Sequence, residues 1–285
     1  MVRRVTPDQL RSMIRQAEAN RRRAISEYNR AVNEYNRKAK RAVDDYNRKV
    51  RAHNAQVRAN RQRLRAEIAR LESRRSSTRY TVSSQSLATA YYRVEEDANS
   101  GVWGERGEAL VDLAGTEAFN SARVANALLG AVGEEEGEGT ALTDELSSLS
   151  ADLDSRWRGA LYAISPRNPD AARHFCTSAR EVILAMIDLK ASDKVVLAAK
   201  PDCQTRNGQP LRREKIGYLL ERYGASHDSL GDFVEQDIND VMDLFGEFNS
   251  ATHGVAGKFD IPTLRSIKQR VEGSIRFLSA IVRVA

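Results

Sequence analysis

Asn249 and His253 are the pair of residues in this sequence best suited to acid–base chemistry. An unperturbed imidazole exchanges its proton near neutral pH, so histidine is the most frequent general acid or base in enzymes. The four-residue spacing would put both side chains on one face of a helix if helical geometry continues to the histidine. Gly254 follows directly, so His253 could instead cap the end of a helix, and both interpretations stay open.

Two arginine–histidine pairs in the C-terminal half are alternative candidates for an acid–base site. Six residues separate Arg167 from His174, and four separate Arg222 from His227. The first pair crosses a proline-rich boundary and the second falls in an expected loop, so we rank both below His253. Four basic residues are candidates for contacts with a phosphate: Arg173, Arg180, Lys215 and Lys258.

A metal-dependent nuclease site is not supported by the acidic residues. Restriction-endonuclease chemistry needs carboxylate ligands and a nearby lysine, commonly Pro-Asp followed by Asp/Glu-x-Lys on strands. Pro201-Asp202 is present, but Glu214 and Lys215 are adjacent and their surroundings read as helical. The two cysteines also lack metal-ligand spacing. We therefore expect no metal site and no cofactor.

The N-terminal part of the chain is strongly basic. Residues 1–80 hold 23 Lys/Arg and 8 Asp/Glu, a balance of +15, whereas residues 81–285 hold 22 and 31, a balance of −9. Such a segment favours an anionic partner, RNA or DNA, although the cations could also be the solvated flank of a coiled coil. The candidate phosphate-binding residues are Arg21, Arg22, Arg23, Arg37, Lys38, Lys40, Arg41, Arg48, Lys49 and Arg51.

The same segment predicts one long helix with a coiled-coil seam. Thr6-Pro7-Asp8 is a helix start, and no Gly or Pro follows until after residue 75. Because a helix of this length cannot be buried by one small domain, we expect it to pair through residues 25–71. The pairing is either between chains, as a homo-oligomer, which we favour, or within one chain, as an antiparallel hairpin. The heptad members are Ile25, Tyr28, Val32, Tyr35, Ala39, Ala42 and Tyr46, followed after a stutter by Val50, His53, Val57, Asn60, Leu64 and Leu71.

Composition limits the cellular setting. No stretch approaches 18 consecutive apolar residues, so we expect no membrane span. The N-terminus lacks the apolar core of a signal peptide, and two cysteines are too few for a disulfide framework. We therefore expect a cytoplasmic protein.

The rest of the sequence reads as successive amphipathic helices with a 3.6-residue apolar period. Ahead of the boundary at 165–169 we expect helices at 82–99, 108–130 and 140–164, with an acidic linker at 133–139. Beyond it lie four helical stretches that predict a bundle, at 170–190, 210–223, 229–249 and 261–283, with a turn at 192–199 and a polar loop at 200–210. The sequence thus predicts an all-α protein with a basic coiled coil (1–76), a helical middle segment (77–164) and a helical bundle (165–285).

The Asn249-x3-His253 spacing resembles part of the ribonuclease motif of the HEPN superfamily, whose members are small four-helix bundles. That motif begins with an arginine, and Phe248 occupies the corresponding position here. The resemblance implies a HEPN-like bundle, and the missing arginine puts the usual RNA cleavage in doubt.

A more specific resemblance combines several segments. The Tyr-Asn-Arg triplets at 28–30, 35–37 and 46–48, together with residues 168–175, 178–181 and 252–254, resemble bacterial proteins called predicted pPIWI-associating nucleases. The resemblance covers mainly residues 165–285. It implies a role, with partner proteins of a defence operon, in conflict with phages and mobile elements, and it brings no catalytic residue with it.

Two functions follow as expectations. The first is a nucleic-acid-directed effector or accessory protein, a nuclease if His253 acts as acid or base, with ribonuclease chemistry favoured over metal-dependent DNA cleavage. The second is a non-catalytic module that oligomerises through the coiled coil and carries a degenerate HEPN-like domain.

Overall fold

One helix, α1 (Pro7–Glu72), accounts for the N-terminal quarter of the chain, as the sequence predicts. In the computed structural model, which describes residues 6–74, 78–101, 105–130, 142–165, 167–168, 170–252 and 261–284, α1 has 66 residues. Its start is capped reciprocally, because Gln9 N donates to Thr6 Oγ1 at 3.4 Å and Thr6 N donates to Gln9 Oε1 at 3.0 Å.

The chain divides into two units, Met1–Arg58 and Ala59–Ala285, and the division falls inside α1. We call residues 7–58 the arm and residues 59–285 the bundle. Every side chain from Thr6 to Lys49 is exposed. Over these residues the arm therefore gains no stability from burying apolar side chains against the rest of the described chain.

The last turns of α1 belong to the bundle. Leu64 and Leu71 are only 1% and 3% exposed and lie in its hydrophobic core. Asn126 Nδ2 donates to Glu67 O at 2.9 Å and to Glu67 Oε2 at 2.8 Å. These two leucines are thus buried within the chain and are not available for the predicted pairing, which stays a prediction for the earlier heptad residues.

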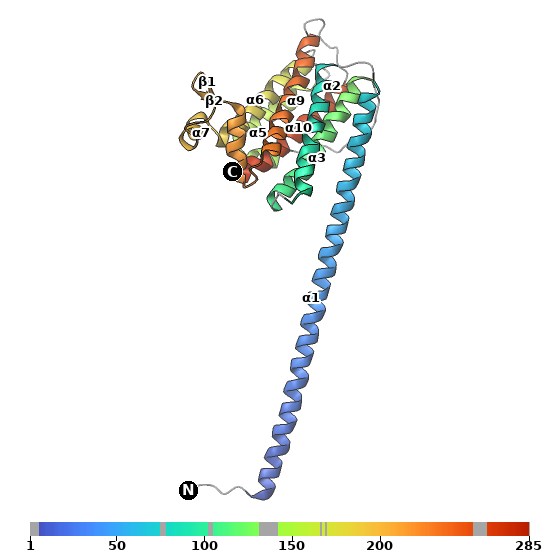
Figure 1. Ribbon diagram of the computed structural model, residues 1–285, viewed down its shortest axis with the longest axis vertical. Helices are drawn as coiled ribbons and strands as arrows, with labels where there is room; N and C mark the ends of the chain where they lie inside the picture. Colours follow the sequence, from blue (N-terminus) through green and yellow to red (C-terminus); the bar gives the residue numbers. More distant parts are fainter. Residues whose placement is uncertain are drawn as a thin grey trace. The chain divides into compact units, whose positions relative to one another are not determined.

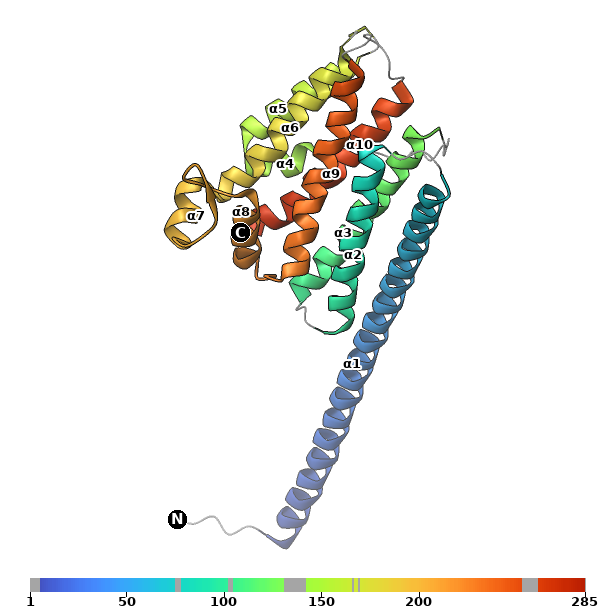
Figure 2. The same ribbon diagram turned by 45° about the horizontal axis from the view of Figure 1, so that its top comes forward.

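The bundle stacks its longer helices in three layers (Figures 1 and 2). The outer layers are α2 (Arg79–Asn99) with α3 (Glu105–Leu128), and α5 (Ala151–Ala163) with α6 (Ala171–Lys190). Between them lie α9 (Asp228–Thr252) and α10 (Ile261–Val284). The shorter elements are α4 (Thr143–Leu149), α7 (Asp193–Ala199), β1 (Thr205–Arg206), β2 (Gln209–Pro210) and α8 (Arg212–Tyr223).

Apolar residues from all three layers form one core. The rings of Trp157 on α5 and Phe175 on α6 pack edge to face, with their centroids 5.9 Å apart. The rings of Phe233 on α9 and Phe277 on α10 do the same, with centroids 5.6 Å apart. The helices expected beyond residue 165 are present as α6, α8, α9 and α10. They share this core with α2 and α3, from the segment predicted as a separate middle part.

Two local features differ from the sequence prediction. The helix expected at 140–164 is broken at Ser150, whose backbone is extended (φ −165°, ψ 131°), into α4 and α5. The apolar periodicity does not reveal this break, because Leu146 and Leu153 on either side of it are seven residues apart, as on one helix face, and both are buried. The loop expected at 200–210 contains the β1–β2 ribbon, where Asn207 and Gly208 have φ of 54° and 78°, as a two-residue Asn-Gly turn requires.

No helix in the described part of the chain is both long and apolar enough to cross a bilayer. The predicted linker at 133–139 and the side chain of His53 lie outside the described residues.

Candidate functional site

The candidate acid–base pair is at the carboxyl end of α9. Asn249 lies in the last turn of that helix, and His253, Gly254 and Lys258 lie outside the described residues. The helical placement of Asn249 agrees with the helix expected over residues 229–249. The relative geometry of the two side chains stays a prediction.

The predicted phosphate-binding residues of the arm are all exposed on α1. Lys38 pairs with Glu34 at 2.9 Å and Arg48 with Asp45 at 2.5 Å. The other eight have no carboxylate partner among the residues that the structure describes, namely Arg21, Arg22, Arg23, Arg37, Lys40, Arg41, Lys49 and Arg51. These cations are therefore free to contact an external anion.

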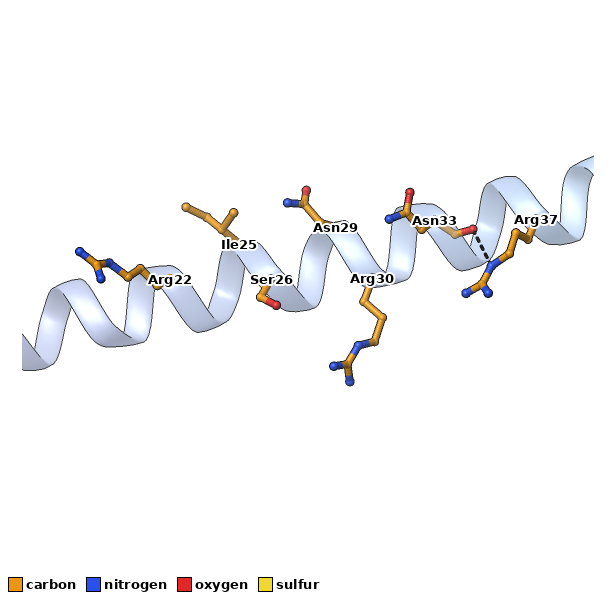
Figure 3. Close-up of a pocket in the computed structure, with 7 residues that line it drawn as sticks. All are labelled: Arg22, Ile25, Ser26, Asn29, Arg30, Asn33 and Arg37. Atoms are coloured by element: carbon orange, nitrogen blue, oxygen red, sulfur yellow. Dashed lines mark hydrogen bonds between the residues drawn. The ribbon is translucent and has the colours of Figure 1, made fainter.

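A shallow groove of about 520 Å³ runs along one flank of the arm. Figure 3 shows Ile25, Asn29 and Asn33 on one side of the helix and Arg30 leaving it in the opposite direction. Arg37 Nε donates to the Asn33 carbonyl at 3.3 Å. Arg30 is an exposed cation that the sequence prediction omitted, although it belongs to the first Tyr-Asn-Arg triplet.

In the bundle, Arg173 and Arg180 are exposed on α6, and Arg173 lies 3.6 Å from Asp170. His174 also faces solvent, with Nε2 3.7 Å from Asp170 Oδ2. Lys215 contacts Asp188 and Asp193 at 2.6 Å each, so its charge is already balanced within the chain. Of the candidate phosphate contacts in the bundle, Arg173 and Arg180 remain accessible.

His227 lies just ahead of α9. Its Nδ1 is 3.3 Å from Asp97 Oδ2 on α2 and 3.0 Å from Ser229 Oγ. These contacts give His227 a structural place between α2 and the start of α9.

A polar groove of about 480 Å³ opens between α2, α8 and α9. Arg213 pairs with Asp232 at 2.7 Å, and Arg212 donates to Asn239 Oδ1. Because both charge signs line the groove, it does not select an anion by charge alone. Its other lining residues are Ser86, Thr89, Ala90, Arg93, Glu235 and Gln236.

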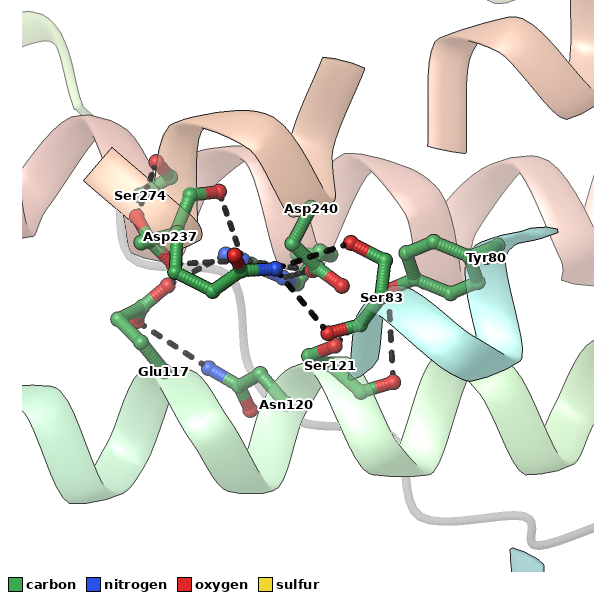
Figure 4. Close-up of polar contacts among 10 residues, drawn as sticks. Tyr80, Ser83, Glu117, Asn120, Ser121, Asp237, Asp240 and Ser274 are labelled. Atoms are coloured by element: carbon green, nitrogen blue, oxygen red, sulfur yellow. Dashed lines mark hydrogen bonds and ion pairs between the residues drawn. The ribbon is translucent and has the colours of Figure 1, made fainter. Parts of the chain in front are cut away.

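The most unusual polar feature is Arg270, which is fully buried on α10. Its guanidinium donates from Nη2 to Asp237 Oδ1 at 2.6 Å, from Nη2 to Asp240 Oδ2 at 2.9 Å and from Nη1 to Glu117 Oε2 at 2.8 Å. Ser274 Oγ donates to the second oxygen of Asp237 at 2.8 Å. Figure 4 shows its partners Glu117 of α3 and Asp237 and Asp240 of α9 close to one another, with Tyr80 of α2 nearby.

Three carboxyl groups surround a single cation, and burial shifts the pKa of two of them, Glu117 and Asp240. Burial raises the pKa of Glu117 to about 8, against the opposing attraction of Arg270 and with a further increase from Asp237. Burial likewise raises the pKa of Asp240 to about 6. Burial acts to lower the pKa of Arg270, but the three carboxylates outweigh it and hold that pKa well above its usual value. Burial thus favours the protonated form of Glu117.

This network has a structural role. Arg270, Asp237 and Asp240 are fully buried and Glu117 is 3% exposed, so they cannot touch a substrate. No group of three or more His, Cys, Asp or Glu side chains in the described ranges is arranged to hold a metal ion. The network joins α3, α9 and α10 through directional bonds.

This network was not predicted from the sequence, although the sequence carries a signal for it. Asp237 is placed four residues from Phe233 and from Val241, on the apolar face of α9. Arg270 falls three residues after Ile267, on the apolar face of α10. A charged residue in the apolar phase of a helix indicates a buried partner.

Comparisons with known proteins gave one match. Residues 146–278, from α4 through most of α10, match the family model described as "Predicted pPIWI-associating nuclease". No curated protein matches the chain, and no solved structure matches it. The matched segment contains Asp237, Asp240 and Arg270 as well as Asn249 and His253, and ends seven residues before the C-terminus. Residues 146–278 of this chain are thus similar to the family of predicted pPIWI-associating nucleases.

Proposed function

We propose that this protein is a nucleic-acid-directed effector or accessory protein of a bacterial system that acts against phages or mobile elements. In this proposal the arm binds RNA or DNA through its phosphates, and the end of α9 carries nuclease activity. The family description names association with pPIWI, so we further propose a defence partner of that kind.

The observation that carries the nucleic-acid proposal is the exposed cationic surface of the arm. Between Pro7 and Arg58 there are 14 Lys/Arg and 6 Asp/Glu, a net charge of +8. Five arginines spaced by seven, seven, four and seven residues share one side of α1, because seven residues make about two helical turns. We call this set the arginine stripe: Arg23, Arg30, Arg37, Arg41 and Arg48.

Binding of labelled nucleic acid at several salt concentrations tests this proposal. Replacing the whole arginine stripe by glutamine should weaken binding and reduce the slope of log K against log salt by up to about 4.5, since each released phosphate contact contributes ~0.9. The control removes the same charge from exposed cations of the bundle: Arg156, Arg158, Arg167, Lys194 and Arg206. Equal effects of the two variants would show that overall charge, and not the stripe, governs binding.

For the nuclease activity we propose His253 as general acid or base and Asn249 as its companion. The HEPN resemblance implies that two such sites would meet in a homodimer and form a shared cleft. With Phe248 in place of arginine, another cation such as Arg173 or Lys258 must stabilise the charge that builds on a scissile phosphate. Incubation of the purified protein with RNA and with DNA, in the presence and absence of divalent metal, measures this activity directly.

The second candidate function is a non-catalytic assembly module. It is favoured by the absence of the motif arginine and by the exposed heptad on the arm, where Tyr28, Tyr35 and Tyr46 are 69%, 73% and 67% exposed. A protein that forms oligomers but cleaves neither nucleic acid under the conditions above would support this function.

A further inference from the structure

The Tyr-Asn-Arg triplets give the arm two opposite faces. Successive residues of an α-helix are about 100° apart, so the arginine of each triplet lies about 200° from its tyrosine. The triplets begin at Tyr28, Tyr35 and Tyr46, and their spacings of seven and eleven residues are close to two and three full turns. The tyrosines therefore align on one face and the arginine stripe lies on the other.

The tyrosine face is an exposed helix surface that no apolar residue covers among those that the structure describes. It consists of the heptad residues Ile25, Tyr28, Val32, Tyr35, Ala39, Ala42 and Tyr46, which we call the tyrosine seam. Its large members are between 36% and 73% exposed. In the described part of the bundle, the exposed large apolar residues are scattered and provide no matching heptad: Val82, Tyr162, Leu189, Val195 and Val284. The described bundle therefore offers no matching helix surface, whereas a second copy of the chain carries the same heptad.

Charge opposes this pairing. Two paired helices lie about 8–10 Å apart, which is close to the Debye length of ~8 Å at physiological ionic strength. Each arm would bring a net charge of +8 to the pair, and no block of acidic residues in it offsets that charge. The seam is also weak, because tyrosine and alanine hold five of its seven positions in place of leucine and isoleucine.

We propose that the tyrosine seam pairs with the seam of a second copy, and that this pairing is driven by nucleic acid bound to the outward arginine stripes. The inference rests on the proposed nucleic-acid binding of the arm. Phosphates on the stripes neutralise the charge that separates the two arms. Because the two faces are opposite, binding and pairing do not compete for side chains. By linkage, pairing strengthens nucleic-acid binding by the same factor.

The test is sedimentation of the full-length chain at about 0.15 M salt, alone and with a DNA duplex of about 30 base pairs, which at roughly 100 Å exceeds the length of the arm. RNA of the same length is titrated separately. We expect monomer without nucleic acid and cooperative assembly of two chains with it. A charge-neutral seam variant, Tyr28→Ser, Tyr35→Ser and Tyr46→Ser, should lose the two-chain complex and bind about 5- to 150-fold more weakly, a typical range for coupled sites.

The arginine-stripe variant should change self-association in the opposite direction to the seam variant. Replacing the stripe by glutamine should increase self-association of the nucleic-acid-free protein, since repulsion between arms falls. Raising salt to about 1 M, where the Debye length is ~3 Å, should do the same for the wild-type protein. A stable wild-type dimer without nucleic acid, or a seam variant that binds as cooperatively as wild type, would overturn the inference.

The outcomes separate this inference from the function on which it rests. If the wild-type protein binds neither DNA nor RNA but forms a seam-dependent dimer at high salt, the nucleic-acid proposal fails and only the pairing surface stands. If it binds nucleic acid strictly as independent monomers, the proposed function stands and the coupling fails.

Discussion

Glu117 of α3 and Gly273 of α10 lie so close that a Cβ atom placed on Gly273 would come within 2.7 Å of Glu117 Oε2. Only a residue without a side chain leaves room here for the carboxyl group that Arg270 binds. The close approach of α3 and α10 and the buried network thus depend on each other.

Gly273→Ala should therefore destabilise the protein, although alanine is the better helix former. We expect a loss of about 1–3 kcal/mol, the usual cost of overpacking, from urea denaturation. Gly159→Ala on α5 is the matched control, because its Cβ would meet nothing within 4 Å. The control should gain roughly 0.5–1 kcal/mol from helix propensity. Equal effects in the two variants would mean that Glu117 moves away without cost.

Arg270→Met should be among the most destabilising single substitutions. It leaves Asp237, Asp240 and Glu117 buried without a cation, and breaking a buried ion pair in this way costs about 3–5 kcal/mol. Arg156→Met, which removes the exposed i,i+4 pair with Asp152 at 2.8 Å, should cost less than about 1 kcal/mol. A small loss for Arg270→Met in denaturant unfolding would show that the network contributes little.

The stability of the folded state should fall as pH rises through the neutral range. The pKa of Glu117 is raised to about 8 in the folded protein from 4.5, so between these values the native state holds a proton that the unfolded state lacks. Its stabilising contribution is complete below pH 4.5 and is lost as pH rises toward 8. Asp240, with a pKa raised to about 6, acts with the same sign below pH 6.

Glu117→Gln isolates this effect. The amide keeps an acceptor for Arg270 but cannot titrate, so thermal unfolding of the variant should vary less between pH 6 and 8 than that of wild type. Parallel melting curves for the two proteins across this range would show that Glu117 is already ionised in the native state.

Leu71→Ala should destabilise the bundle by about 2–5 kcal/mol, because the side chain is buried and its removal leaves a cavity. Ile25→Ala, in the same helix but 51% exposed, should leave the stability of the unpaired chain nearly unchanged. Melting temperatures measured without nucleic acid compare the two. If Leu71→Ala is also neutral, the last turns of α1 are not part of the bundle core.

His253→Ala distinguishes catalysis from capping. A catalytic histidine should give a variant with the wild-type melting temperature and no cleavage of nucleic acid. A histidine that only caps α9 should cost about 1 kcal/mol of stability and leave cleavage unaltered. Measuring both properties on the same preparation decides between them, and a lower melting temperature with full activity would end the catalytic assignment.

The sequence alone determined the helical character of this protein. The spacing of apolar residues predicted α1, α2, α3, α6, α8, α9 and α10, because amphipathic periodicity is a local property of each segment. The break at Ser150 also had a local signal, since a serine precedes Asp152 and Asp154 in the first turn of α5. The Asn207-Gly208 turn was readable in the same way.

Only the tertiary structure decided which apolar and charged residues share an environment. Leu71 and Tyr28 both belong to the heptad pattern, yet Leu71 is buried among the apolar residues of the bundle and Tyr28 is exposed on the arm. Arg270 and Glu117 are 153 residues apart in the chain and become partners only when α3 packs against α10. Periodicity identifies the buried face of a helix, but it cannot name what lies opposite, since that depends on how distant segments pack.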